Sequence, residues 1–387
     1  MKITALSTIA AAAIVIASAS TASSQVIKIA SCSPLSGSQG SLGDMIKLGA
    51  QIAVEEAQPS FSKLGFKLEL SPQDDQASPD VGVAVAKRIV NDPEILGIVG
   101  HFNSGVAIPS SEVYKDYDLV MVSPANTNPK VTERLYANVN RVCGRDDVQG
   151  PVGADFAIDE LKAKVIFIVT DKTAYGQGVA EAFRDRARAR GARIAGFVGT
   201  EEKSNFQSLI LQMKVHKPDL VYLGGIYDQG GLLVKQMREK GIKALFMGPD
   251  GLDSSEFVRI AQEAAKGAYY TTVAGPVDQY PKAAEFSRAF QARFNKKPES
   301  FALYSYDAAK TIIEAIRSAA AQNGGKIPSR VAVCKAVRQL SCEGITGTIE
   351  FDSKGDRRKS DYYIVQMREP VYPGVTVKVT SAAPPAN

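Results

Sequence analysis

Short apolar runs alternate along the chain with longer segments in which apolar residues recur every three or four positions. The runs are rich in β-branched and large apolar side chains, which predicts strands at residues 26–31, 67–71, 95–100, 119–123, 165–170, 193–198, 220–223 and 245–248. The segment 80–91 shows the helical pattern, because Val81, Val85 and Ile89 fall on one face behind Pro79. Strands separated by helices of this length predict right-handed crossovers and parallel sheets.

The alternation of predicted strands and helices changes around residues 145–151 and again after residue 275. About four strands precede residue 145 and about four more lie between 165 and 250, which predicts an α/β protein with two doubly wound parallel sheets. A single (β/α)8 barrel also fits the alternation but leaves the break near 145–151 unexplained. Beyond 275 we expect helices at 283–294, 301–321 and 329–340, then strands at 347–351 and 362–367.

The two ends of the chain predict an exported protein. Met1 and Lys2 precede an apolar run over residues 5–16 and then small residues, the three-part pattern of a signal peptide, here residues 1–24. The run is shorter than the roughly 20 residues that a membrane-spanning helix needs. We read residues 381–387 as a disordered tail, and we expect a periplasmic location for the mature chain.

Composition narrows the class of function. The 387 residues are 45% apolar and 22% charged, with a net charge of +5 that is spread along the chain rather than concentrated in a basic stripe. A nucleic-acid partner is therefore not expected. The only two histidines are His101 and His216, and no phosphate loop, zinc motif or nucleophile elbow is present, so we expect no enzyme, no metal and no cofactor. A Ser104–His101 nucleophile and base is a weak alternative.

The four cysteines would meet an oxidising compartment after export. Cys334 and Cys342 are close in sequence and form the preferred disulfide, with Cys32 and Cys143 as a weaker second pair. Four cysteines allow three pairings, and free buried thiols remain the alternative.

Polar residues follow several of the predicted strands. They are Asn103 and Ser104, Asn126 and Thr127 in the segment Ala125-Asn126-Thr127, Tyr175, and Asp250. Ligands of parallel α/β sheets bind beyond the carboxyl ends of the strands, so these residues are candidates for a small-molecule site. Ser104 also stands at a helix start, where it could bind a carboxylate or simply cap the helix. Asp250 could bind a ligand or simply form the turn Pro249-Asp250-Gly251. Tyr175 could likewise contact a ligand or only pack in the core.

Several motifs, taken in order, resemble the periplasmic leucine/isoleucine/valine-binding proteins of ATP-driven importers. The chain carries SPLSGSQGSLG, GHFNSGVAIPSSEVY, MVSPANTNP, VTDKTAYGQGVA, FMGPDG and GITGTIEFDSKGD. The resemblance implies the type I periplasmic binding fold, with two lobes joined by a three-crossover hinge. It implies residues 25–145 and 275–346 in the first lobe, and 146–274 and 347–380 in the second.

The same resemblance implies roles for individual residues. Ser104 and Thr127 would hold a ligand carboxylate, with Tyr175 reaching the same end from the second lobe. The Ala125 carbonyl and Asp250 would accept hydrogen bonds from an ammonium group.

The pocket for the ligand side chain departs from the family pattern. Leu42 replaces a tyrosine, Ile226 and Tyr227 replace another aromatic arrangement, and Asp250 is shorter than the usual glutamate. Asn103 and Ala77 fall near the positions of the family disulfide.

The resemblance also implies a monomer that delivers an amino acid (branched-chain, other aliphatic or aromatic) to the membrane permease and ATPase subunits of an ABC importer. An aromatic or other organic acid, or a small amide, is the alternative ligand. A ligand-sensing receptor module is the alternative role.

Overall fold

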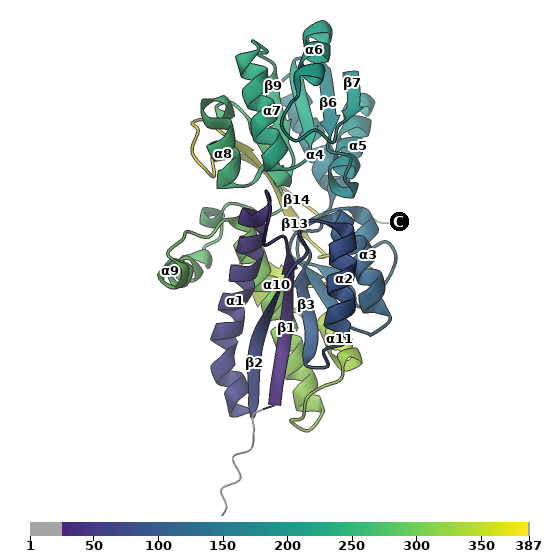
Figure 1. Ribbon diagram of the computed structural model, residues 1–387, viewed down its shortest axis with the longest axis vertical. Helices are drawn as coiled ribbons and strands as arrows, with labels where there is room; N and C mark the ends of the chain where they lie inside the picture. The colour runs from purple at the N-terminus through teal and green to yellow at the C-terminus, as the bar shows by residue number, and fades with distance from the viewer. Residues whose placement is uncertain (1–24, 386–387) are drawn as a thin grey trace, which may run out of the picture.

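The computed structural model describes residues 25–385, and the predicted signal peptide lies outside the described residues. Figure 1 shows two lobes stacked along the long axis of the molecule. One lobe contains a five-stranded sheet of order β2-β1-β3-β4-β5, and the other a seven-stranded sheet of order β14-β13-β10-β9-β8-β6-β7. The predicted α/β architecture with two doubly wound sheets is confirmed.

The first sheet is parallel throughout. Its strands are β1 (Gln25–Ser33), β2 (Phe66–Asp74), β3 (Ile95–Gly100), β4 (Val120–Ser123) and β5 (Val139–Arg141). Helices α1 (Gly40–Lys63), α2 (Pro79–Val90) and α3 (Ser104–Lys115) follow the first three strands. Neighbouring residues Ile98 and Val99 of β3 pack into different apolar clusters, because successive side chains of a strand point to opposite faces. Burial on both faces explains why β3 is an unbroken apolar run.

The second sheet is parallel from β7 to β10 and ends in two antiparallel strands. Its strands are β6 (Val165–Thr170), β7 (Arg193–Gly199), β8 (Leu220–Gly224), β9 (Leu245–Gly248), β10 (Tyr269–Thr272), β13 (Ser360–Gln366) and β14 (Val375–Ala382). Its helices are α4 (Asp146–Asp159), α5 (Ala174–Ala189), α6 (Gln207–His216), α7 (Tyr227–Glu239) and α8 (Ser255–Ala261). Ser381 and Ala382, expected in a disordered tail, belong to β14 and pair with Asp361 and Ser360.

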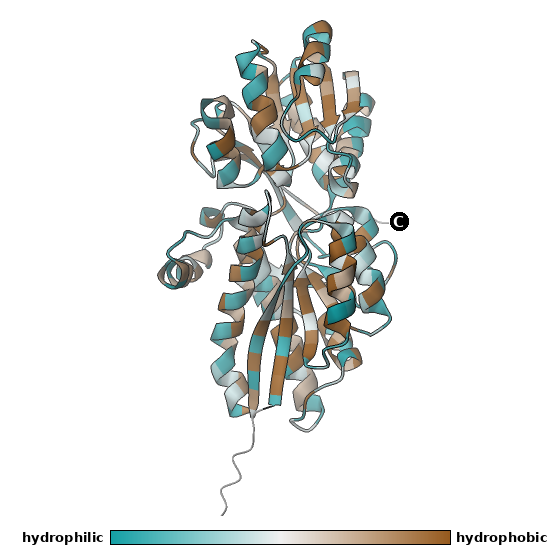
Figure 2. Cartoon of the chain, in the orientation of Figure 1, coloured by the Kyte–Doolittle hydropathy of each residue, from teal (hydrophilic) through white to brown (hydrophobic). Residues whose placement is uncertain are grey.

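The chain passes between the two sheets three times. After β10 it returns to the first lobe and forms α9 (Ala283–Phe294), α10 (Ser300–Gln322) and α11 (Arg330–Gln339). There α10 packs along α1 and a hairpin forms from β11 (Cys342–Gly344) and β12 (Gly347–Ile349). Figure 2 shows apolar residues along the strands and polar residues on the outward faces of the helices. None of the helices within residues 25–385 is long and apolar enough to cross a membrane.

Both expected disulfides are wrong, because all four cysteines are free and buried. The Cys334 thiol donates a hydrogen bond to the carbonyl of Asp118 at 2.9 Å, away from Cys342 in the hairpin. Cys32 and Cys143 pack into different apolar clusters, so they belong to separate parts of the core. Burial raises the pKa of Cys334 to about 12 and that of Cys342 to about 11, which keeps both as thiols.

Candidate functional site

Each sheet has a switch point at which its strand order reverses, and the loops that follow the strands on either side of it lie at the interface between the lobes. The first sheet reverses between β1 and β3, and the second between β6 and β8. The loops that leave these strands diverge at such a switch point, and this opens the crevice in which α/β proteins bind ligands. Helices α1 and α3 begin there in the first lobe, and α5 and α7 begin there in the second.

The first lobe brings Ser104 and Thr127 to this interface. Ser104 is the first residue of α3, and its Oγ accepts a hydrogen bond from the backbone N–H of Asn128 at 3.3 Å. Asn103, not Ser104, occupies the helix cap, and it makes no side-chain capping bond. The carbonyl of Thr127 accepts the N–H of Asp146 at 2.9 Å, while its hydroxyl is buried without a hydrogen-bond partner in the described structure.

A bonded turn holds the Ala125–Thr127 loop in shape. The hydroxyl of Ser123 accepts the N–H groups of Ala125 and Asn126, and it donates to the Asn126 side chain at 2.8 Å. The Asn126 amide then donates to the carbonyl of Phe102 at 2.7 Å, which ties this loop to the loop before Ser104. The two predicted carboxylate-binding residues are therefore held by one hydrogen-bonded unit.

The second lobe contributes Tyr175 and Asp250, which are bonded to each other. The Tyr175 hydroxyl donates to Oδ1 of Asp250 at 2.6 Å and accepts the N–H of Gly251 at 2.7 Å. The side chain of Gln149 donates to the same oxygen of Asp250 at 2.6 Å. Tyr175 thus lies beside the acid, whereas the family resemblance implied a contact with the ligand carboxylate.

The residues expected around a ligand side chain are also buried. Leu42 is fully buried in the main apolar cluster of the core. Ile226, the residue directly before α7, packs in the same cluster. The Tyr227 hydroxyl donates to the carbonyl of Ser38 at 2.6 Å, across the interface between the lobes. Asn103 donates to Oε1 of Gln39 at 2.8 Å, and its own amide oxygen has no partner among the described residues.

Direct hydrogen bonds between the lobes show that they are closed together. The Ser38 hydroxyl donates to Asp228 at 2.7 Å at one edge of the interface. The Asn128 amide donates to the carbonyl of Ala174 at 2.6 Å, between the α3 and α5 starts. On the α9 side, the Ser255 hydroxyl donates to Glu299 at 2.5 Å.

Asp146 is the site residue that sequence reasoning missed. It is the first residue of α4, is 1% exposed, and neither of its carboxylate oxygens has a hydrogen-bond partner among the described residues. Burial, followed by the negative charge of Asp250, raises its pKa well above the usual value, although the nearby Thr127 hydroxyl and the charge of Arg141 oppose the shift. A buried carboxylate without a partner is costly, so this position calls for a positively charged or hydrogen-bond-donating occupant.

Asp250 shares this electrostatic environment. Burial raises its pKa to about 7, although the hydrogen bonds from Tyr175 and Gln149 oppose the shift. The hydroxyl of Tyr222 and the amide oxygen of Gln149 are also buried without partners in the described structure. The second lobe therefore presents two carboxylates, and the first lobe presents the buried Thr127 hydroxyl, which lies close enough to Asp146 to lower its pKa.

A large cavity lies elsewhere, beside α9. It has a volume of about 1310 Å³ and is lined by α9, by Met45 of α1, by Ser255 and by Tyr372 and Pro373. None of the nine predicted ligand residues lines it. Eight of the predicted residues are instead buried, and Asn103 is half-buried.

The alternative of a Ser104–His101 catalytic pair fails on geometry. Both ring nitrogens of His101 are engaged away from Ser104, Nδ1 with Asp75 at 2.7 Å and Nε2 with the Tyr114 hydroxyl at 3.0 Å. Within residues 25–385, no group of three or more His, Cys, Asp or Glu side chains could hold a metal ion.

Comparison with known proteins gives the same architecture. The family model described as "Periplasmic binding protein" matches residues 26–370. Leu/Ile/Val-binding protein homolog 2 of Brucella abortus is 35% identical over 339 residues, 87% of this chain and 89% of that protein. A leucine-, isoleucine-, valine-, threonine- and alanine-binding protein of Pseudomonas aeruginosa is 34% identical over 341 residues, 88% of this chain and 89% of that protein.

Among solved structures, a leucine-binding protein, LivK, from Thermotoga maritima superposes with a TM-score of 0.81. The two chains are 26% identical, and the match covers 92% of this chain and 98% of that one. The matched family model and the two sequence relatives each span most of the chain. This chain belongs to the periplasmic binding protein family.

Proposed function

We propose that this protein binds an amino acid between its lobes in the periplasm and delivers it to the membrane permease of an ABC importer. Export by cleavage of residues 1–24 and action as a monomer without catalysis are parts of the same proposal. The observation that carries it is the pair of buried carboxylates, Asp146 and Asp250, together with the buried Thr127 hydroxyl beside Asp146.

This arrangement matches the two charges of an amino acid. The ligand ammonium would lie between Asp146 and Asp250, where its positive charge would stabilise the ionised form of these buried carboxylates. The ligand carboxylate would accept hydrogen bonds from Thr127 and Ser104 at the start of α3, where the helix dipole favours an anion. The buried Leu42 and Ile226 favour an aliphatic side chain.

The test is calorimetric titration of protein that has been unfolded and refolded to remove any co-purified ligand. L-leucine, L-isoleucine, L-valine and L-alanine are titrated, and benzoate represents the organic-acid alternative. A micromolar dissociation constant corresponds to about −8 kcal/mol. Binding of benzoate but no amino acid would contradict the proposal, as would chemical turnover of the ligand seen by NMR.

A double variant tests the assignment of the carboxylate end. Each charge-assisted hydrogen bond contributes about 1.5–3 kcal/mol, so Ser104→Ala with Thr127→Ala should weaken binding at least about 100-fold. Ser110→Ala is the matched control, because Ser110 is a buried serine of the same helix whose hydroxyl has no partner among the described residues. Equal affinity of the double variant and the control would remove Ser104 and Thr127 from the site.

A further inference from the structure

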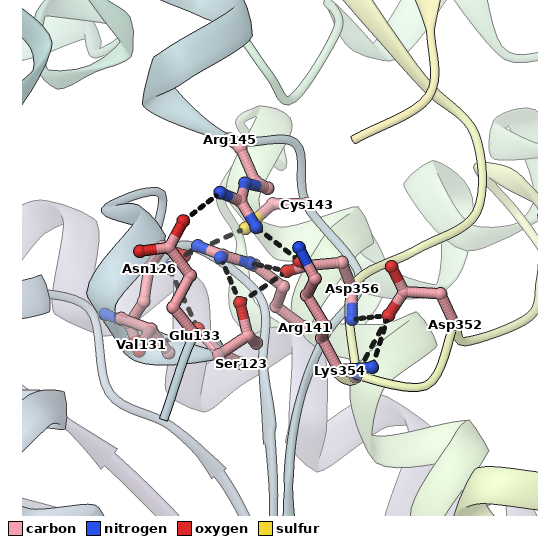
Figure 3. A network of polar contacts seen from close by, with 12 residues as sticks. Ser123, Asn126, Val131, Glu133, Arg141, Cys143, Arg145, Asp352, Lys354 and Asp356 are labelled. Atoms are coloured by element: carbon pink, nitrogen blue, oxygen red, sulfur yellow. Dashed lines mark hydrogen bonds and ion pairs between the residues drawn. The ribbon is translucent and has the colours of Figure 1, made fainter. Parts of the chain in front are cut away.

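Asp356 lies on the third connection between the lobes, in the turn between β12 and β13, and is 1% exposed. Its two carboxylate oxygens bind different arginines. Oδ1 accepts from Nε of Arg141 at 2.5 Å and from the Thr132 hydroxyl at 2.8 Å. Oδ2 accepts from a terminal nitrogen of Arg145 at 2.7 Å. Figure 3 shows Asp356 between the two guanidinium groups.

Arg141 connects Asp356 to the first-lobe half of the ligand site. One of its terminal nitrogens donates to the carbonyl of Asn126 at 2.7 Å and to the carbonyl of Asn128 at 2.9 Å. These are the carbonyls on either side of Thr127, so Arg141 fixes the backbone that carries the Thr127 hydroxyl. Arg141 is itself fully buried.

Arg145 connects Asp356 to the second-lobe half. It directly precedes Asp146, and its backbone N–H donates to the Tyr362 hydroxyl of β13 at 2.9 Å. Its side chain also bonds Glu133 of the first lobe at 2.8 Å and Asp147 of α4 at 2.6 Å. The start of α4, which carries Asp146, is thereby held to both lobes.

The charges of this cluster make Asp356 its central member. The side chains of Glu133 and Asp147 are 41% and 30% exposed, so water screens their charges. Asp356 is as buried as the two arginines. Burial alone would raise the pKa of Asp356, but the charges of Arg141 and Arg145 outweigh it and lower the pKa. The carboxylate therefore stays ionised and both guanidinium groups stay paired with it.

We propose that Asp356 is a positioning residue that holds the two halves of the ligand site in register across the hinge. Through Arg141 it sets Thr127, and through Arg145 it sets Asp146. Asp356 touches no ligand in this arrangement, and its effect on affinity reaches the site only through the two arginines. The ligand-binding part of this inference rests on the proposed function, whereas the hinge part does not.

The first test compares Asp356→Asn with Asp352→Asn by calorimetry, with L-leucine as the probe. Asp352 is a matched control in the same turn, because the described contacts of its side chain include the N–H groups of Gly355 and Asp356 but neither arginine. Both substitutions loosen the turn and lower the melting temperature. Asp356→Asn should weaken leucine binding at least tenfold, and Asp352→Asn should change it less than twofold.

The second test needs no ligand. Spin labels at the exposed positions Lys87 of α2 and Arg188 of α5 report the distance between the lobes in the ligand-free protein. Asp356→Asn should broaden this distance distribution relative to wild type and to Asp352→Asn. If wild type binds no leucine, the proposed function is in doubt while this measurement still decides the hinge part.

Two results would overturn the inference. One is a folded Asp356→Asn protein with wild-type affinity and an unchanged distance distribution. If that variant does not fold, Thr132→Val replaces it. This change removes the hydrogen bond from Thr132 to Asp356 and the one from Arg141 to Thr132, while both arginines stay paired with Asp356. Thr132→Val should weaken leucine binding about threefold and broaden the distribution, and wild-type behaviour in both would equally overturn the inference.

Discussion

Asp146 and Asp250 are buried at the lobe interface, and neither forms an ion pair with a described arginine or lysine. Tyr175 and Gln149 donate to Asp250, whereas Asp146 receives no hydrogen bond from the described residues. A ligand ammonium would supply the missing positive charge. The affinity for the ligand should therefore depend on the protonation states of these two residues.

We expect affinity for an amino acid to fall as the pH is lowered from 8 to 5.5. Burial raises the pKa of Asp250 to about 7 and that of Asp146 well above its usual value, so protons occupy this pair near neutrality. The ammonium binds the ionised carboxylates, so binding releases protons, and acidification opposes it by up to about tenfold per pH unit for each proton released. Calorimetry in buffers of different ionisation enthalpy measures both the affinity and the released protons.

Asp250→Asn should bind more weakly and show a flatter pH profile. Asp253→Asn is the control, because burial also raises the pKa of Asp253 to about 7 while its oxygens accept from Thr272 and Tyr372 instead of facing the site. A pH-independent affinity of the wild type would contradict the assignment of the ammonium to this pair.

Residue patterns predicted only part of this site. Ser104, Thr127, Tyr175 and Asp250 follow strands of parallel sheets, and topology places such positions at one edge. Asp146 begins a helix, where an acidic residue is ordinary because it favours the helix dipole. Its missing hydrogen bonds exist only in the folded structure, so no sequence signal distinguished it from a surface acid.

At the scale of elements, α5 meets the first lobe through a close contact at Gly178. A Cβ at this position would lie 2.7 Å from the amide nitrogen of Asn128, which itself bonds the carbonyl of Ala174. We expect Gly178→Ala to weaken ligand binding, because the added methyl group displaces Asn128 from the closed interface. The same change should raise the melting temperature, since alanine favours a helix by about 1 kcal/mol over glycine.

Gly105→Ala provides the control for that prediction. A Cβ at Gly105 on α3 would meet the Ala174 side chain at 3.8 Å, an ordinary contact. Titration and thermal unfolding of both variants separate the two effects. Wild-type affinity of Gly178→Ala would show that the α5 contact does not belong to the ligand-bound state.

Element prediction succeeded where local signals were strong. The predicted helix at 283–294 coincides with α9, which ends at Asn295 in the left-handed conformation that favours asparagine. The predicted helix at 80–91 lies one residue from α2, whose Ser78 cap accepts the N–H of Val81. The strand β5 escaped prediction because its three residues are too few to show a period.

At the scale of the whole molecule, the two-lobed architecture was predicted correctly, whereas the cysteine pairing was not. Alternating strands and helices constrain sheet topology strongly. A disulfide depends on geometry that sequence proximity does not give, as Cys334 and Cys342 show. The proposed lobes, residues 25–145 with 275–346 and residues 146–274 with 347–380, meet at three boundaries. Because β12 pairs with β11 in the first lobe, the third connection begins after β12, later than the proposed boundary, and Asp356 lies in it.

Closure of the lobes provides the link between binding and transport in this proposal. The ligand's partners Thr127 and Asp250 come from opposite lobes, so an amino acid binds the closed state better than the open one. A ligand can shift a conformational equilibrium only by that difference in affinity. The direct bonds of Ser38 to Asp228 and of Asn128 to Ala174 would then form together with the ligand contacts.

A crystal structure of the protein with L-leucine tests the central claim most directly. The account predicts leucine between the lobes, with its carboxylate within hydrogen-bond distance of Ser104 and Thr127 and its ammonium between Asp146 and Asp250. Leucine bound only in the cavity beside α9, or turned so that its carboxylate meets the two aspartates, would contradict it.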